Sequence, residues 1–160
     1  MKTLYYPLIG ILLLILSCSK PPDYPDEPII TYERVSVNTL PQDDLLQYSF
    51  RLTFSFTDGD GDLGDENNFA NVRVWDSRIG IELDTNTLSI PFIPVQGAGN
   101  GISGEMHLLL YSACCIFEGR NCEPFPELPV DTLTYLIEIE DRAGNVSNRI
   151  ESEPIFLTCD

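Results

Sequence analysis

The sequence feature that most constrains the fold is the strict alternation of side chains over Gln47–Thr57. A period of two places every second residue on the same face of a strand. One face is apolar and aromatic and the other is polar: Tyr48, Phe50, Leu52, Phe54 and Phe56 against Ser49, Arg51, Thr53 and Ser55. We therefore predict a half-buried antiparallel strand whose aromatic face belongs to the core.

Other segments also show strand-like patterns, and we find no convincing amphipathic helix in the chain. The predicted strands are Ile29–Val37, Gln47–Thr57, Asn71–Trp75, Ile79–Leu83, Leu88–Val95, Ile102–Ser112, Thr132–Asp141 and Val146–Leu157. Seven to eight short strands separated by turn-forming residues predict an all-β fold. We expect one antiparallel β-sandwich domain over residues 29–160.

A dense group of carboxylates directly follows the strand Gln47–Thr57, in a segment that also holds three glycines: Asp58, Asp60, Asp62, Asp65 and Glu66. Two unit charges about 5 Å apart repel by roughly 0.8 kcal/mol even in water, so an ion-free loop of this kind is disfavoured. Ca²⁺ reverses the sign of this interaction because it binds about six to eight oxygen ligands. We predict a Ca²⁺ site that uses these five residues, and a solvated acidic turn is the alternative.

This acidic loop is not an EF-hand. Counted from Asp58, the sixth position is Leu63 where an EF-hand requires glycine, and the twelfth is Phe69 where it requires glutamate. The flanking segments are predicted strands, whereas helices flank an EF-hand loop. The expected site is therefore an irregular loop at the end of a β-strand.

The N-terminal residues 1–17 have the features of a signal peptide, with Lys2 before a nearly continuous apolar run. The run ends in Leu14-Ile15-Leu16-Ser17-Cys18, which resembles the lipobox of bacterial lipoproteins. This resemblance implies that Cys18 is diacylated on sulfur and becomes the mature N-terminus, so that lipid anchors the protein to a membrane. An ordinary signal peptide followed by a chance cysteine is the alternative.

Residues 18–28 contain four prolines and predict a semi-rigid tether of about 30 Å. Lys20, followed by the acidic residues Asp23, Asp26 and Glu27, loosely resembles the surface-export signal of Bacteroidetes lipoproteins. This resemblance implies a lipid-anchored protein at the outer membrane or cell surface. A periplasm-facing orientation is the alternative.

The mature chain is strongly acidic. Of the nine basic residues only Lys2 precedes Cys18, and none of the 25 acidic residues does, so the mature net charge is eight minus 25, or −17. Without a basic patch to neutralise phosphates, the domain is not expected to bind nucleic acid. The candidate partners are the membrane, through the N-terminal lipid, and an envelope protein or glycan.

Four cysteines remain after Cys18, and an even number in an exported chain predicts two disulfides. Neighbouring Cα atoms lie about 3.8 Å apart, below the range of about 4.4–6.8 Å for a disulfide, so Cys114 and Cys115 are not expected to pair. One of these two residues is expected to bond to Cys122 and the other to Cys159. Both connectivities remain open.

Two stretches resemble known families. Leu128–Tyr135 and Asp141–Ser147 resemble the penultimate and last strands of bacterial Ig-like and fibronectin type III domains, and Phe54–Gly64 with Asp141–Asn145 resembles small uncharacterised Bacteroidetes lipoproteins. The resemblance implies an Ig-like sandwich in which Gln47–Thr57 is strand B and Thr132–Glu140 is strand F. The loops that follow these two strands would then lie at the same end. Asp141 would then be a sixth metal ligand beside the acidic loop, and a turn-capping aspartate is the alternative.

Together these features predict a lipid-anchored, non-catalytic envelope or surface protein with a Ca²⁺-stabilised Ig-like module for adhesion, assembly, or glycan or protein binding. A purely structural envelope subunit without an ion is the alternative. A hydrolase that uses Asp58 and Glu66 as acid and base is disfavoured, because an exposed glycine-rich turn offers no apolar pocket to separate their pKa values.

Overall fold

The computed structural model describes residues 23–67, 71–79, 86–94, 101–117, 120–124 and 127–159. Every helix or strand element within these ranges is a β-strand, which confirms the predicted all-β class. No helix in these ranges is long and apolar enough to cross a membrane. The predicted signal peptide and Cys18 lie outside the described residues.

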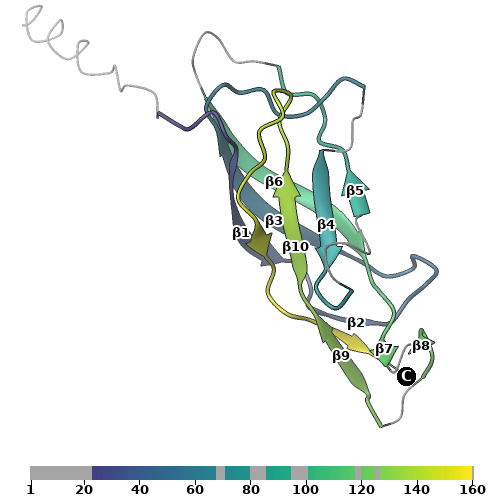
Figure 1. The fold of residues 1–160 in the computed structure, drawn as a ribbon. Helices are drawn as coiled ribbons and strands as arrows, with labels where there is room; N and C mark the ends of the chain where they lie inside the picture. Colours follow the sequence, from purple (N-terminus) through teal and green to yellow (C-terminus); the bar gives the residue numbers. More distant parts are fainter. Residues whose placement is uncertain are drawn as a thin grey trace, which may run out of the picture.

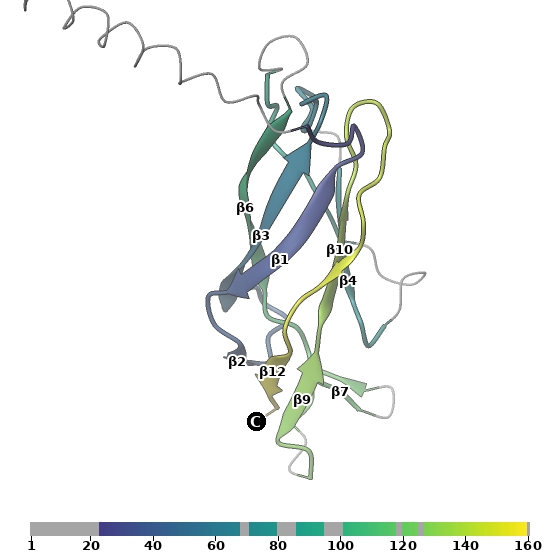
Figure 2. The same ribbon diagram turned by 90° about the vertical axis from the view of Figure 1, so that its left-hand side faces the viewer.

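Two antiparallel sheets face each other and form the main body of the molecule (Figures 1 and 2). The first sheet has the order β1-β3-β6, with β1 at Ile29–Val35, β3 at Ser49–Asp58 and β6 at Ile102–Tyr111. The second has the order β11-β10-β4-β5, with β11 at Ile150–Glu151, β10 at Tyr135–Ile139, β4 at Val72–Asp76 and β5 at Asn86–Leu88.

Shorter strands close the end of the molecule that carries the C-terminus (Figure 1). A small sheet has the order β2-β12-β9, with β2 at Thr39–Pro41, β12 at Ile155–Thr158 and β9 at Val130–Leu133. Its β2–β12 pair is parallel. Strands β7 at Ile116–Phe117 and β8 at Arg120–Asn121 form a separate antiparallel pair.

The hydrophobic core lies between the two main sheets, and β3 supplies several of its large side chains. Phe50, Leu52 and Phe54 are at most 2 % exposed, and they belong to one buried cluster with residues of β4 and β10. The predicted alternation is therefore confirmed for these positions. The prediction is wrong for Tyr48, which is 46 % exposed because it precedes the strand.

The predicted strand pattern needs correction in its details. The described residues form twelve strands rather than seven to eight, because several ladders are only two to four residues long and carry no readable alternation. The predicted strand Thr132–Asp141 divides between β9 and β10, which pair in different sheets. Of the predicted strand Ile79–Leu83, only Ile79 is described, and it lies in a turn.

Two disulfides tie the shorter strands to the core. Cys114 is bonded to Cys122 and Cys115 to Cys159, which is one of the two connectivities that the sequence leaves open. Cys115 and Cys159 are both 1 % exposed, so their bond joins the segment after β6 to the residue that follows β12 inside the core.

The two disulfides should differ in their contribution to stability. The Cys115–Cys159 bond spans 44 residues and the Cys114–Cys122 bond spans eight, which in the chain-entropy description correspond to about 4 and about 2.5 kcal/mol. Urea unfolding of a Cys115→Ser/Cys159→Ser variant should therefore show the larger loss of free energy. The matched control is Cys114→Ser/Cys122→Ser, and an equal or larger loss in the control would contradict the prediction.

Candidate metal centre

Strands β3 and β10 bring two acidic segments to the same end of the sandwich. Both strands run toward the end opposite the C-terminus, so the loop that begins at Asp58 and the turn that begins at Asp141 meet there (Figures 1 and 2). Asp58 is the last residue of β3 and pairs with Ile102 of β6. The position of its carboxylate therefore follows from the register of a core strand.

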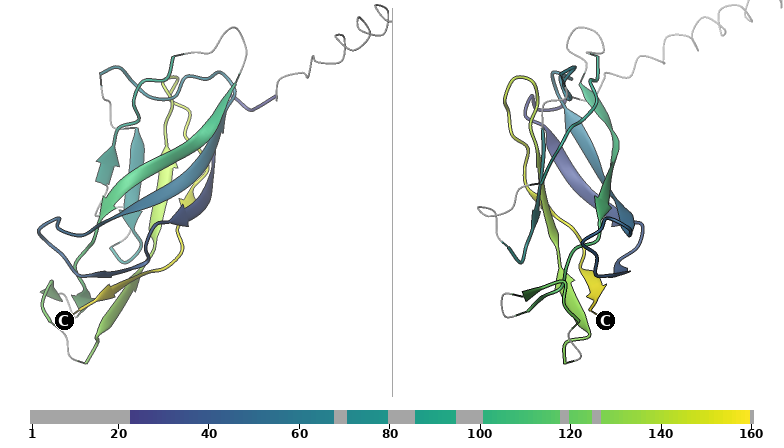
Figure 3. Two further views of the ribbon diagram at one scale, coloured as in Figure 1. Left: turned by 180° about the vertical axis from the view of Figure 1, so that it is seen from behind. Right: turned by 90° about the vertical axis from the view of Figure 1, so that its right-hand side faces the viewer.

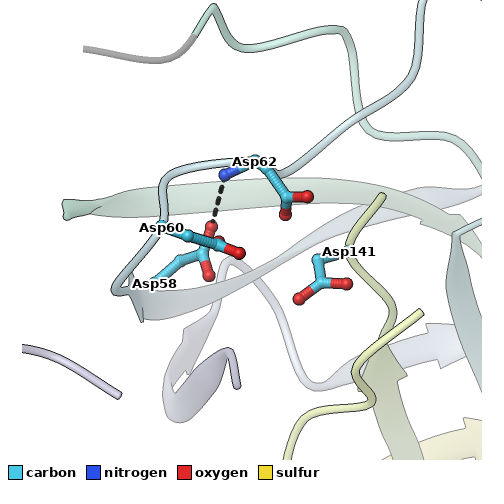
Figure 4. A group of neighbouring side chains, drawn as sticks. All are labelled: Asp58, Asp60, Asp62 and Asp141. Atoms are coloured by element: carbon cyan, nitrogen blue, oxygen red, sulfur yellow. Dashed lines mark hydrogen bonds between the residues drawn. The ribbon is translucent and has the colours of Figure 1, made fainter. Parts of the chain in front are cut away.

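Four carboxylates converge at this end: Asp58, Asp60, Asp62 and Asp141 (Figure 4). Each offers an oxygen atom, and these atoms all lie within 4.8 Å of one another. The site runs from the interior to the surface, because Asp58 is 0 % and Asp141 7 % exposed, Asp62 is half-buried and Asp60 is exposed. Such a set supplies only oxygen ligands, the kind that Ca²⁺ prefers.

The backbone of the acidic loop is shaped by glycine and by one apolar side chain. Gly61 and Gly64 have φ angles of 70° and 77°, in the left-handed region that other residues rarely adopt. Leu63, between them, is fully buried in the core. The loop therefore curls between Asp60 and Gly64 and is anchored to the domain at Leu63.

Arg142 holds the loop against the neighbouring turn. Its Nη1 donates hydrogen bonds to the carbonyl oxygens of Leu63, Gly64 and Ile93, at 2.9, 2.8 and 3.3 Å. Its guanidinium also lies over the ring of Phe92, 4.8 Å from the centroid. Because Arg142 follows Asp141 directly, these contacts help to set the position of that carboxylate.

The carboxylate of Asp141 is itself held by one residue of its own turn. The backbone N–H and the side-chain Nδ2 of Asn145 donate to its two oxygens, each at 2.8 Å. This is the turn-capping arrangement that the sequence offered as an alternative role for Asp141. The structure combines it with the position in the four-carboxylate group, since each carboxylate oxygen can accept more than one contact.

Two oxygens of the group have no hydrogen-bond partner in the described part of the chain. The Oδ2 atom of Asp58 accepts from the backbone N–H of Asp62 at 2.9 Å, but its Oδ1 is buried and unpaired. The Oδ1 atom of Asp62 is also buried and unpaired. A buried unsatisfied polar group costs about 1–3 kcal/mol, and more when charged, so a cation bound at these oxygens would be stabilising.

The electrostatic environment opposes ionisation of the buried members. Burial, reinforced by the negative charges of Asp60, Asp62 and Asp141, raises the pKa of Asp58 to about 6. Burial and the charges of Asp141 and Asp60 also raise the pKa of Asp62, and Arg142 opposes that shift. Four ionised carboxylates at these distances repel one another, and a bound cation would reduce that repulsion.

Two predicted ligands are not brought into the group. Asp65 instead accepts a hydrogen bond from the backbone N–H of Asn67 at 2.6 Å, and Glu66 is exposed. The chain turns away from the site after Gly64, because Leu63 is buried in the core and Arg142 binds the carbonyl oxygens of Leu63 and Gly64. Asp65 and Glu66 are therefore not among the four carboxylates that converge, and the role of Arg142 is one that sequence reasoning missed.

A second surface feature is an apolar groove of about 420 Å³ that is lined by residues of the edge strands β5 and β6 and of β4 and β10. Strand β6 is an edge of its sheet (Figure 3). Leu109 and Tyr111 on this strand are exposed and line the groove together with Leu46. The buried Val74 and Tyr135 form part of its lining. The groove thus exposes the apolar side chains of Leu46, Leu109 and Tyr111 next to core residues.

Comparisons with protein-family models, with curated proteins and with solved structures find no match to this chain. The chemistry of the site therefore rests on its own geometry.

The raised pKa of Asp58 predicts a pH-dependent stability of the ion-free protein. In the unfolded chain this carboxyl has its ordinary pKa of 3.8, so the folded state binds its proton more tightly. Its contribution is favourable below pH 3.8 and is lost as the pH rises through about 6, by about 3 kcal/mol in total. In chelator, Asp58→Asn should therefore raise the free energy of unfolding by about that amount at pH 7.5 and by little at pH 4.

Urea unfolding of both proteins at the two pH values measures this difference. Asparagine keeps the acceptor for the Asp62 N–H, so the comparison isolates the charge of Asp58. A gain from Asp58→Asn that is the same at pH 4 and pH 7.5 would contradict the predicted linkage.

Proposed function

We propose that this protein is a lipid-anchored, non-catalytic envelope protein at the outer membrane or cell surface. Its Ig-like module is stabilised by Ca²⁺ and binds an envelope protein or glycan in adhesion or assembly. The observation that carries the proposal is the convergence of four carboxylates from two separate segments around a buried, unpaired oxygen of Asp58.

Ca²⁺ fits this donor set better than other common ions. The four residues offer carboxylate oxygens only, whereas Zn²⁺ in structural sites prefers sulfur and nitrogen ligands. Mg²⁺ demands a near-octahedral arrangement and usually binds through only one or two carboxylates. Asp58, Asp60, Asp62 and Asp141 would hold the ion, which would supply positive charge between the loop and the turn.

The strand order supports the Ig-like part of the proposal. The strand order is β1-β3-β6 in one sheet and β11-β10-β4-β5 in the other. This order corresponds to strands A-B-E and G-F-C-C′ of an Ig-like sandwich. The acidic loop is then the B–C loop and the turn at Asp141 is the F–G loop, which lie at the same end of an Ig-like sandwich.

A binding role is favoured over the alternatives by two further observations. The apolar groove along β6 exposes Leu109 and Tyr111, and a cleft with apolar side chains at its rim is a kind of surface that binds partners. The hydrolase alternative paired Asp58 with Glu66, and Glu66 lies outside the four-carboxylate group. The proposed module is therefore a binding domain whose metal ion is structural.

Ca²⁺ should raise the thermal stability of the mature, lipid-free protein. At a Ca²⁺ concentration about 100 times the dissociation constant, binding to the folded state alone adds about 2.7 kcal/mol, or a midpoint shift of about 10 °C for a domain of this size. Differential scanning calorimetry with Ca²⁺ and with chelator measures the shift. Equal midpoints in the two conditions would refute the proposed ion.

Variants within the same loop provide matched controls for that experiment. Asp60→Asn and Asp58→Asn each remove one negative charge from the four-carboxylate group and should abolish most of the Ca²⁺-dependent shift. Asp65→Asn and Glu66→Gln remove the same charge a few residues away, outside the group, and should keep it. If all four variants lose the response equally, general acidity rather than the defined site is responsible.

The anchor is tested by Cys18→Ala in the full-length chain, expressed in a bacterium that processes lipoproteins. Without the sulfur that accepts the lipid, the protein should move from the detergent-extracted membrane fraction to the soluble fraction, because no other anchor is proposed. Two acyl chains give stable anchoring, so the change should be nearly complete. A variant that stays in the membrane fraction would contradict the proposed lipid anchor.

A further inference from the structure

Part of the predicted tether, residues 18–28, is in contact with the domain. The backbone N–H of Gly59 donates a 2.7 Å hydrogen bond to the carbonyl of Pro25, and Pro28 is buried. The segment Tyr24–Pro25, which the sequence assigns to the tether, therefore lies against the acidic loop. The described chain also begins at this end of the sandwich (Figure 1).

Two glycines make room for this contact. A Cβ atom on Gly59 would lie 2.4 Å from the carbonyl oxygen of Tyr24 and 2.5 Å from that of Pro25. A Cβ atom on Gly101 would lie 2.8 Å from the ring of Tyr24. All three distances are shorter than real Cβ contacts allow. The tether therefore packs directly against the backbone of Gly59 and Gly101, where there is no side chain.

The residue that receives the tether lies between two of the candidate metal ligands. Gly59 separates Asp58 from Asp60, and the oxygens of both carboxylates belong to the four-carboxylate group (Figure 4). The same backbone conformation therefore presents the N–H of Gly59 to Pro25 and the two carboxylates to the ion. Without an ion, mutual repulsion in this group favours opening of the loop.

We propose that cation binding at the four-carboxylate group and docking of the Tyr24–Pro25 tether on Gly59 are energetically coupled, so that the cation fastens the tether to the domain. This inference rests on the proposed Ca²⁺ site and adds its regulation. The cation fixes the loop in the conformation that receives the tether. By thermodynamic reciprocity, the docked tether raises the affinity for the cation by the same factor.

The coupling would control how far the domain stands from its anchor. Tyr24 lies six positions after Cys18, and a fully extended chain of that length reaches only about 20 Å. When the tether is released, the free chain extends to Ile29, where β1 begins, and its reach becomes about 35 to 40 Å. A calcium-loaded domain is thus held close to the lipid by its acidic end, and a calcium-free domain is free to move away.

The test is a calorimetric Ca²⁺ titration of the mature chain that carries Cys18→Ala and therefore no lipid. A second chain begins at Pro28 and lacks the tether but retains every strand. Coupling of ordinary strength predicts a Ca²⁺ dissociation constant about five-fold or more higher in the truncated chain. Equal dissociation constants in the two chains would overturn the coupling.

Gly59→Ala provides a second, independent variant. Gly59 is not among the glycines with positive φ, so alanine suits its backbone and conflicts mainly with Tyr24 and Pro25. In the long chain it should weaken Ca²⁺ binding by about the same factor as truncation, and in the truncated chain it should add nothing. A loss that persists in the truncated chain would place the effect in the loop itself and overturn the coupling.

Amide exchange of Gly59 separates failure of this inference from failure of the proposed function. In the long chain, Ca²⁺ should slow exchange of the Gly59 N–H by about the same factor as the affinity difference between the two chains. A long chain that binds no Ca²⁺ refutes the proposed site, and the coupling with it. A long chain that binds Ca²⁺ without any change in Gly59 exchange refutes the coupling alone.

Discussion

The register of β3 is the constraint on which the rest of this structure depends. The strand pairs along its whole length with β6, and Phe50, Leu52 and Phe54 fill the core between the sheets. A slip of one residue would turn these side chains to solvent, at a cost of about 1.5–3 kcal/mol for each. Together they outweigh the few kcal/mol of one unsatisfied carboxylate, so the core keeps Asp58 buried at the end of the strand.

The buried charge in turn organises the segments around it. The loop after β3, the turn at Asp141 and the tether at Tyr24–Pro25 all meet at this end, although they are far apart in the sequence. Arg142 holds the loop through the carbonyls of Leu63 and Gly64, and its charge opposes but does not cancel the raised pKa of Asp62, which leaves a negative site of defined shape. Backbone rigidity and clustered charge together suit a divalent cation.

Much of this arrangement could be predicted because it depends on local pattern. Alternation identified β3 and most of its core face, and the adjacency of Cys114 and Cys115 excluded one disulfide connectivity. The sequence did not separate Asp65 and Glu66 from the four converging carboxylates, because their charges resemble those of Asp58 and Asp60. Only the burial of Leu63 and the bonds of Arg142 turn the chain away from the site after Gly64.

The sequence by itself determined the all-β class, the acidic loop and the even set of cysteines, since each follows from residue type and spacing within one segment. The tertiary structure decided which carboxylates converge, which cysteines pair and where the tether rests. Those outcomes depend on contacts between residues up to 83 positions apart, such as Asp58 and Asp141, and no local pattern encodes such distances. Sheet packing selects them, because only one register buries the core of both sheets at once.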